Sequence, residues 1–203
     1  MRVFIAIVCC VAFPVWSEAQ AMLPRNDAAF SIGWAGSQIR FPHTDPRRPS
    51  YELWRSSLLL GVSGGHYWTD HLKTDVEAGW YRTPERENYQ DVVIDGRRTL
   101  VSSTYRIRDA RLAIGQSFQF GRNASVHPYV GAGAEISRRS VDLEPVLPGR
   151  TPIVETSTLV RPFVKAGAKM YASEKLFFVT DLKVGFNRDL DHVLWKIGVG
   201  FDF

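Results

Sequence analysis

Cysteine and long apolar runs are both scarce in this sequence of 203 residues. The only two cysteines, Cys9 and Cys10, lie near the start of the chain. After residue 21 no stretch approaches the roughly 18 apolar residues that a membrane-spanning helix needs. Any membrane insertion of the remaining chain must therefore use a closed barrel, because only helices and closed barrels satisfy every backbone N–H and C=O group in hydrocarbon.

The first 21 residues have the pattern of a secretory signal peptide. Arg2 supplies a positive start, 3–15 is apolar, and Ala19-Gln20-Ala21 is a small-x-small cleavage motif. We predict a signal peptide at 1–21 and a mature domain at 22–203, which then contains no thiol for disulfides or metal binding. The alternative is a lipoprotein acylated at Cys9 or Cys10, although the bulky Val8 disfavours it.

Helix-period stretches, internal repeats and linkers are absent from 22–203, whereas alternation of apolar and polar residues recurs about eight times. The predicted strands lie near 27–40, 51–65, 71–82, 103–120, 126–139, 158–171, 175–188 and 192–203. In the last strand Val193, Trp195 and Ile197 alternate with Leu194 and Lys196. The pattern predicts an all-β chain, an eight-stranded antiparallel up-and-down transmembrane β-barrel.

The connections between these strands alternate in length. Segments 66–70, 121–125 and 172–174 are short, whereas 83–102 and 140–157 are long. Outer-membrane barrels share this asymmetry, with short periplasmic turns and longer outer loops. Turn signals inside the two long segments, Asp95-Gly96 and Pro148-Gly149, predict that both extend the wall as hairpins.

Alternation alone does not distinguish a membrane barrel from a soluble one with an apolar interior. Glycine placement favours the membrane barrel, because ten strand glycines share the face that carries the charges. Glycine weakens a strand and is expected where a neighbour approaches closely, as in a crowded interior. They are Gly33, Gly61, Gly79, Gly115, Gly131, Gly133, Gly167, Gly185, Gly198 and Gly200.

With these features the chain resembles the OmpA/OmpX-type family of small outer-membrane barrels, or porin-family β-barrel domains, over nearly all of 23–203. The resemblance is carried by the strand His127-Pro128-Tyr129-Val130-Gly131-Ala132-Gly133-Ala134, by the turn Tyr67-Trp68-Thr69-Asp70-His71-Leu72, and by the terminal Phe203 after Phe201 and Val199. It implies the outer membrane of a Gram-negative bacterium. It also implies that Val199, Phe201 and Phe203 form the signal read by the barrel-assembly machinery during biogenesis.

A barrel of eight strands has an interior that side chains fill, so we expect a plug of ion pairs in the lumen. The expected members are Arg55, Lys73, Asp75, Glu77, Arg111, Glu135, Lys165, Lys169, Asp181, Lys183, Lys196 and Asp202. Buried charges must be paired and hydrogen-bonded, and the mixed signs permit this. A narrow conduit is the alternative, which makes a small-solute channel the second hypothesis.

Arginines in the expected outer loops are candidates for binding anions, since their guanidinium groups bind phosphate and carboxylate bidentately. The partners we expect are outer-membrane lipids and lipopolysaccharide, with any protein partner of the loops undefined and nucleic acid excluded by export. The alternative is a solvated rim. The candidates are Arg47, Arg48, Arg97, Arg98, Arg138 and Arg139.

The leading hypothesis is a non-enzymatic outer-membrane protein with a structural or surface-interaction role through its loops. A lipid A-modifying enzyme is the third hypothesis, and its site would need a nucleophile and a base near the outer rim. The candidates are His43 and His192, with Ser50, Ser102, Ser103 or Ser140 as hydroxyl partners. No compact motif joins them, and the spacing of the five histidines matches no metal-ligand pattern, so we expect no catalytic residues, metal or cofactor.

Overall fold

The computed structural model describes most of the chain after the predicted signal peptide. The described residues are 25–41, 51–94, 97–121, 125–145, 153–187 and 189–203. The signal peptide and both cysteines lie outside them, so the signal peptide and the cleavage motif stay predictions. No helix within these ranges is long and apolar enough to cross a membrane.

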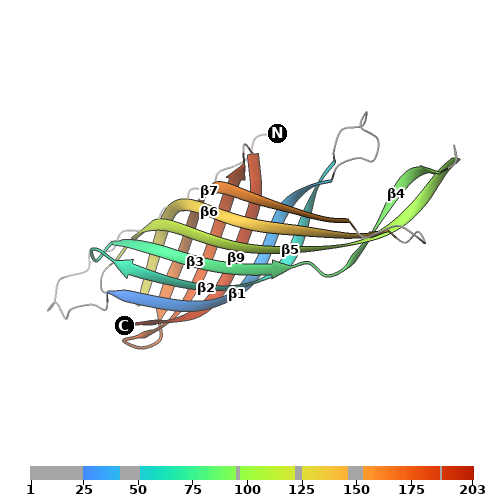
Figure 1. Ribbon diagram of the computed structural model, residues 1–203. Helices are drawn as coiled ribbons and strands as arrows, with labels where there is room; N and C mark the ends of the chain where they lie inside the picture. Colours follow the sequence, from blue (N-terminus) through green and yellow to red (C-terminus); the bar gives the residue numbers. More distant parts are fainter. Residues whose placement is uncertain (1–24, 42–50, 95–96, 122–124, 146–152, 188) are drawn as a thin grey trace, which may run out of the picture.

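The described chain consists of antiparallel strands joined in sequence order (Figure 1). The strands are β1 (Asn26–Phe41), β2 (Tyr51–Tyr67), β3 (Leu72–Arg82), β4 (Arg86–Ile94), β5 (Arg97–Gln119), β6 (Val126–Pro145), β7 (Ile153–Tyr171), β8 (Leu176–Asn187) and β9 (Asp189–Asp202).

Eight of these strands form a closed barrel, which confirms the predicted fold class. Neighbouring strands pair in the order β3-β2-β1-β9-β8-β7-β6-β5-β4, and an additional pairing of β3 with β5 closes the ring. The first and last strands are therefore wall neighbours, with Phe30 opposite Val199. Among the described strands β4 alone lies outside the ring, because it pairs only with β5.

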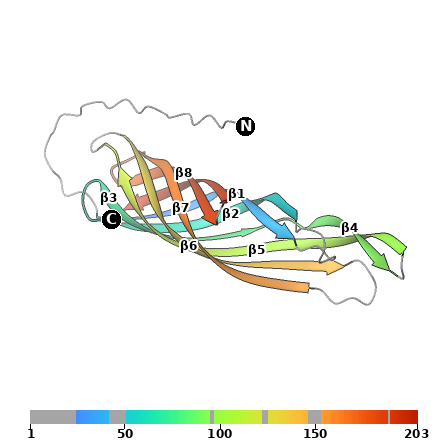
Figure 2. The same cartoon turned by 90° about the horizontal axis from the view of Figure 1, so that it is seen from above.

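The strands β4 to β7 continue past the barrel as a sheet on the side of the long connections, which we call the loop-side sheet (Figure 2). The pairing of β3 with β5 ends at Arg82↔Arg108, but β5 pairs with β4 as far as Ile94↔Arg97. The pairing of β6 with β7 likewise extends to Leu143↔Ile153. Both predicted hairpin extensions are confirmed, although the turn residues themselves lie outside the described ranges.

Alternation along each strand gives the wall an apolar outer face. Among the residues that the structure describes, thirty large apolar side chains are exposed there or at the strand ends. They include Trp34, Trp80 and Trp195 towards the loop side and Phe178, Phe201 and Phe203 towards the turn side. This is the opposite of a soluble barrel with an apolar interior, so that alternative is wrong. An apolar band flanked by aromatic residues is the outer surface that lipid requires.

Inward glycines lie where the neighbouring strand or an inward ring leaves no room for a side chain. A Cβ atom on Gly133 would lie 2.2 Å from the backbone oxygen of Ile114 and 2.8 Å from the ring of Phe163. One on Gly33 would lie 2.1 Å from the backbone oxygen of Trp195. Real Cβ atoms do not tolerate such contacts, so these positions require glycine for close packing of the wall and its contents.

Candidate functional site: the charged lumen and the loop-side rim

The inner face of the barrel is lined by charged side chains of both signs. Seven acidic and seven basic side chains are buried there, and the half-buried Lys73 and Asp191 bring the number to eight of each sign. The acids are Asp27, Asp75, Glu77, Asp109, Glu135, Asp181, Asp191 and Asp202, and the bases are Lys73, Arg111, Arg139, Arg161, Lys165, Lys169, Lys183 and Lys196. Among the described residues the lumen is therefore electrically balanced.

At the turn end, one lysine joins the first strand of the barrel to the last. Lys169 Nζ on β7 lies 2.9 Å from Asp27 Oδ2 on β1 and 3.0 Å from Asp202 Oδ1 on β9. Lys73 also pairs with Asp27, at 2.7 Å, and Tyr171 donates to Asp202 at 2.5 Å. These bonds connect strands that are far apart in the sequence at the place where the barrel closes.

The middle of the lumen is crossed by lysine–carboxylate pairs between opposite parts of the wall. Lys165 lies 2.6 Å from Asp75, and Lys183 and Lys196 lie 2.9 and 2.5 Å from Glu77. The partners are far apart in sequence, since Lys183 lies on β8 and Glu77 on β3. Side chains that span the lumen in this way occupy the path that a solute would take.

Towards the loop end the cations are arginines arranged around Glu135. Its Oε1 lies 3.3 Å from Arg111 Nη1, 3.4 Å from Arg161 Nε and 3.7 Å from His192 Nε2. Arg161 Nη2 also donates to Ser137 at 2.6 Å. Glu135, Arg161 and His192 are each at most 1% exposed, so this layer is shielded from solvent.

The last charged layer packs against an apolar cluster that narrows the loop end of the lumen. Tyr81 donates to Asp109 at 2.8 Å, and Arg139 donates to the same carboxylate at 3.2 Å. Ser37 lies 3.1 Å from the Tyr81 hydroxyl. The buried apolar residues of this cluster are Ala35, Leu59, Tyr81, Tyr105, Ile107 and Leu194.

Little free space remains inside the barrel. The cavity bounded by Asp27, Lys73, Asp75, Tyr129 and Lys196, among others, has a volume of about 40 Å³. A water molecule needs at least roughly 10–15 Å³ by this measure, so the cavity has room for only a few waters. The lumen is a filled interior, as the barrel-size rule for eight strands predicts.

The structure places the expected lumen residues on the inner face, with the exception of one side chain that it does not describe. Asp75, Glu77, Arg111, Glu135, Lys165, Lys169, Asp181, Lys183, Lys196 and Asp202 are buried, and Lys73 is half-buried. Arg55 lies on β2, but its side chain is not among those described.

Sequence reasoning missed several members of this network: Asp27, Asp109, Arg139, Arg161, Asp191 and His192. A signal was present for five of them. The residues Asp27, Asp109, Arg139, Arg161 and His192 each stand an even number of residues from an inward glycine on the same strand, so strict parity identifies their face.

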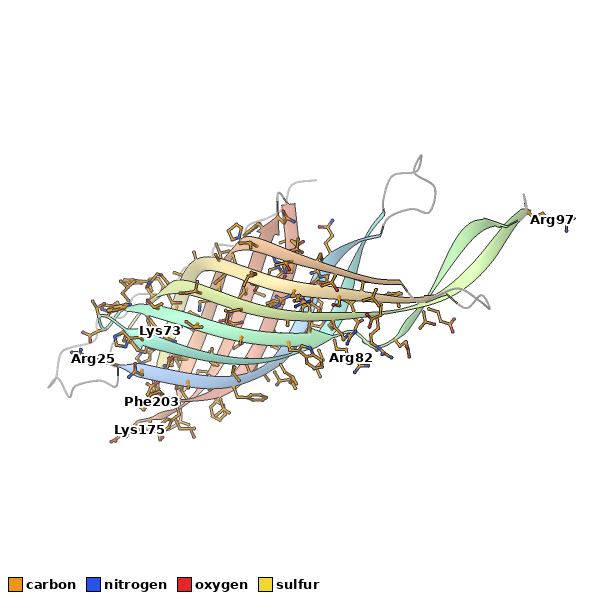
Figure 3. All side chains as sticks on the ribbon, in the orientation of Figure 1. Arg25, Lys73, Arg82, Arg97, Lys175 and Phe203 are labelled. Carbon is orange, nitrogen blue, oxygen red and sulfur yellow. The ribbon has the colours of Figure 1, made fainter. Side chains whose placement is uncertain are left out.

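One of the loop arginine candidates was wrongly placed. Arg139 points into the lumen and is 6% exposed, because it shares the inward parity of Glu135 on a strand that runs further than predicted. Its neighbour Arg138 faces outwards, and Arg97 is exposed at the tip of the loop-side sheet (Figure 3). Arg47 and Arg48 lie outside the described residues, as does the side chain of Arg98.

Of the residues considered for catalysis, the two whose side chains the structure describes do not converge. His192 is fully buried inside the barrel rather than at the outer rim, whereas Ser140 faces outwards and lies 3.1 Å from the Thr156 hydroxyl. His43 and Ser50 lie outside the described residues, and the side chains of Ser102 and Ser103 are not described.

The residues of the expected assembly signal lie on the outer face. Val199, Phe201 and Phe203 are 43%, 47% and 57% exposed, and the rings of Phe201 and Phe203 stack at 6.2 Å. Phe203 lies at the turn end of the barrel (Figure 3). Its recognition by the assembly machinery remains a prediction.

Comparison with known proteins shows the same architecture. No family model and no curated protein sequence matches the chain. Among solved structures it is similar to the outer-membrane protein OprG of Pseudomonas aeruginosa, with 14% identity and a TM-score of 0.58 over 89% of this chain and 97% of that one. It is also similar to Ail, the attachment invasion locus protein of Yersinia pestis, with 13% identity and a TM-score of 0.52 over 88% and 99%.

A third similar structure is the N-terminal β-barrel domain of Pseudomonas aeruginosa OprF, with 18% identity and a TM-score of 0.51 over 89% of this chain and 98% of that domain. At these identities the comparisons show the fold. The chain has the fold of the small eight-stranded outer-membrane barrels.

Proposed function

We propose that this protein is an integral outer-membrane protein of a Gram-negative bacterium with a closed lumen. In this proposal it acts without catalysis, in envelope structure or surface interaction, through its loop-side sheet. The observation that carries the proposal is the pairing of an exposed apolar belt with a filled, charge-balanced interior. The belt requires lipid around the wall, and the interior leaves the loop side as the surface available to partners.

Membrane insertion is supported by the energetics of the outer face. Lys or Arg at the lipid midplane costs about 2–4 kcal/mol, and the outward side chains midway along β9, Trp195, Ile197 and Val199, are apolar. Two charged side chains of the same strand, Lys196 and Asp202, point inwards. OprG, which has the same fold, is itself an outer-membrane protein, and this supports the same location.

A closed lumen favours a structural or binding role over conduction. Ion pairs join β7 to β3 through Lys165 and Asp75, and β8 to β3 through Lys183 and Glu77. A solute would have to break several such pairs, each of which leaves a buried charge without its partner. The small-solute channel is therefore the weaker hypothesis.

A binding role without catalysis is supported by the positions of the candidate residues. A hydrolytic site needs a nucleophile and a base within hydrogen-bond reach of each other. His192 lies beside Glu135 and Asp191 in the lumen, where a lipid substrate in the membrane does not reach it.

Three measurements test the proposal. The mature chain should fractionate with the outer membrane and migrate differently on a gel before and after heating, and a monomer that stays soluble without detergent would overturn it. The refolded protein should give no steady conductance in planar bilayers. Lipid A from cells with and without the protein should have the same acylation pattern by mass spectrometry, and a changed pattern would favour the enzyme hypothesis.

A further inference from the structure

Four arginines face outwards where the barrel wall meets the loop-side sheet; we call them the rim arginines. They are Arg82 at the end of β3, Arg106 and Arg108 on β5, and Arg138 on β6. Arg82 lies opposite Arg108 in the register, and Arg138 lies opposite Ala110, two residues further along β5. Figure 3 shows Arg82 at the loop end of β3, far from Arg25 and Lys73 at the turn end.

Among the side chains that the structure describes, the rim arginines carry more positive charge than the carboxylates beside them neutralise. Arg106 lies 2.9 Å from Glu85, and Arg108 lies 2.8 Å from Asp142. Arg82 and Arg138 have no carboxylate partner within the part of the chain that the structure describes. Like charges directly opposite each other on neighbouring strands are destabilising, so an anion bound at Arg82 would relieve its repulsion with Arg108, which lies opposite it in the register.

An outward hollow of about 490 Å³ lies next to the rim arginines. Leu58, Leu60 and Trp80 line its apolar part, and Arg82, Glu85 and Arg106 line its polar part. Leu58 lies opposite Arg82, and Leu60 lies opposite Trp80. The hollow is therefore apolar on the side of the lipid belt and cationic on the side of the loops.

We propose that this hollow binds a phosphorylated lipid of the outer leaflet, namely lipid A. One phosphate of its headgroup lies between Arg82 and Arg106, the two arginines that line the hollow, and an acyl chain packs against Leu58 and Trp80. Guanidinium groups bind phosphate bidentately through charge-assisted hydrogen bonds. The loop side of such a barrel faces the exterior, where lipid A is the phosphorylated lipid.

This inference rests on the proposed membrane location, but the binding of lipid A at the hollow is a separate claim. The site lies on the lipid-facing wall, and only Arg138 was among the arginines that the sequence singled out. Glu85 is 51% exposed and Asp142 is 20% exposed, so both can release their arginines to a phosphate without burying a charge.

Native mass spectrometry of the refolded full-length mature barrel in zwitterionic detergent tests the site. The probes are lipid A with both phosphates, lipid A with the phosphates removed, and inorganic phosphate. Wild-type protein should bind the phosphorylated form about tenfold more tightly than the dephosphorylated form, and inorganic phosphate should compete only weakly. Equal binding of the two lipids overturns the inference. Free phosphate that binds as tightly as the lipid also overturns it, because the site would then recognise the ion alone.

Variants assign the binding to the rim arginines. The double variant Arg82→Gln/Arg106→Gln removes both arginines that line the hollow and should lose about tenfold in affinity. The control Arg25→Gln/Arg97→Gln removes the same charge at exposed positions remote from the hollow and should bind like wild type. Glu85→Gln, which frees Arg106, should bind about two- to fivefold more tightly.

The gel-mobility shift checks that each variant is folded. A folded double variant that binds like wild type, or a control that loses as much as the double variant, overturns the inference while the membrane location stands. A wild-type chain that stays soluble without detergent overturns the proposed function instead.

Discussion

Replacement of Glu135 by glutamine should destabilise the barrel strongly although it changes the shape of the side chain very little. Glu135 is 1% exposed, and Arg111, Arg161 and Lys183 lie 3.3, 3.4 and 3.7 Å from its carboxylate. At an effective dielectric of about 20, each such contact amounts to about 5 kcal/mol of gross Coulomb energy. Desolvation offsets most of this, and removal of one partner from a buried ion pair costs about 3–5 kcal/mol.

The free energy of unfolding should therefore fall by about 3–5 kcal/mol in Glu135→Gln. The measurement is urea unfolding of the protein in lipid vesicles, followed by tryptophan fluorescence and by the gel-mobility shift. Lys175→Gln, at an exposed position on the turn side, is the control and should unfold like wild type. A double variant Glu135→Gln/Lys183→Met restores the charge balance and should be less destabilised than the sum of its single variants.

A loss below about 1 kcal/mol in Glu135→Gln would refute this reasoning, because a water-filled lumen would then screen the arginines and the interior would not be packed. Such a result would also weaken the argument against conduction, which depends on the same ion pairs.

Three further changes test other parts of the structure. Val199→Lys places a charge on the lipid face and should cost about 2–4 kcal/mol of stability in vesicles. Arg97→Ala, at the exposed tip of the loop-side sheet, is the control and should assemble like wild type. If Val199→Lys assembled as completely as this control, the assignment of the lipid face would be wrong. Gly133→Ala should lower the folded fraction on a gel, because the added Cβ would lie 2.2 Å from a backbone oxygen and impair closure of the barrel. Gly64→Ala is the control and should fold normally, because a Cβ there lies 3.5 Å from the nearest backbone oxygen. Lys169→Met should lower the temperature at which the gel shift is lost, since Asp202 loses its lysine, and an unchanged temperature would show that the link between β1 and β9 adds no stability.

The sequence predicts the wall of this barrel well because its signal is local and periodic. In β9 the alternation of Trp195 and Ile197 with Lys196 is enough by itself to identify both faces of the strand. Strand ends are less well defined, and the fourth predicted strand, 103–120, corresponds to β5 at 97–119. The Asp95-Gly96 turn signal predicts the hairpin of β4 and β5, but it does not show that β5 runs without a break from this hairpin into the wall.

The members of the lumen are predictable by parity, but their pairings are not. Lys183 and Glu77 are 106 residues apart in sequence and 2.9 Å apart in the structure. Which lysine meets which carboxylate depends on the register around the whole ring. Whether Arg139 lies in the lumen or in an outer loop depends likewise on where the lumen ends. The charge of the residue does not indicate where that end is.

The continuity of β5 through the wall and into the loop-side sheet has a mechanical consequence. Residues 97–107 lie beyond its last register pair with β3, and at about 3.4 Å per residue they make a stalk about 35 Å long. Hydrogen bonds to β4 and β6 along this length make it stiff. A molecule that meets Arg97 at the tip therefore does so at a fixed height above the lipid, whereas a flexible loop would sample a range of heights.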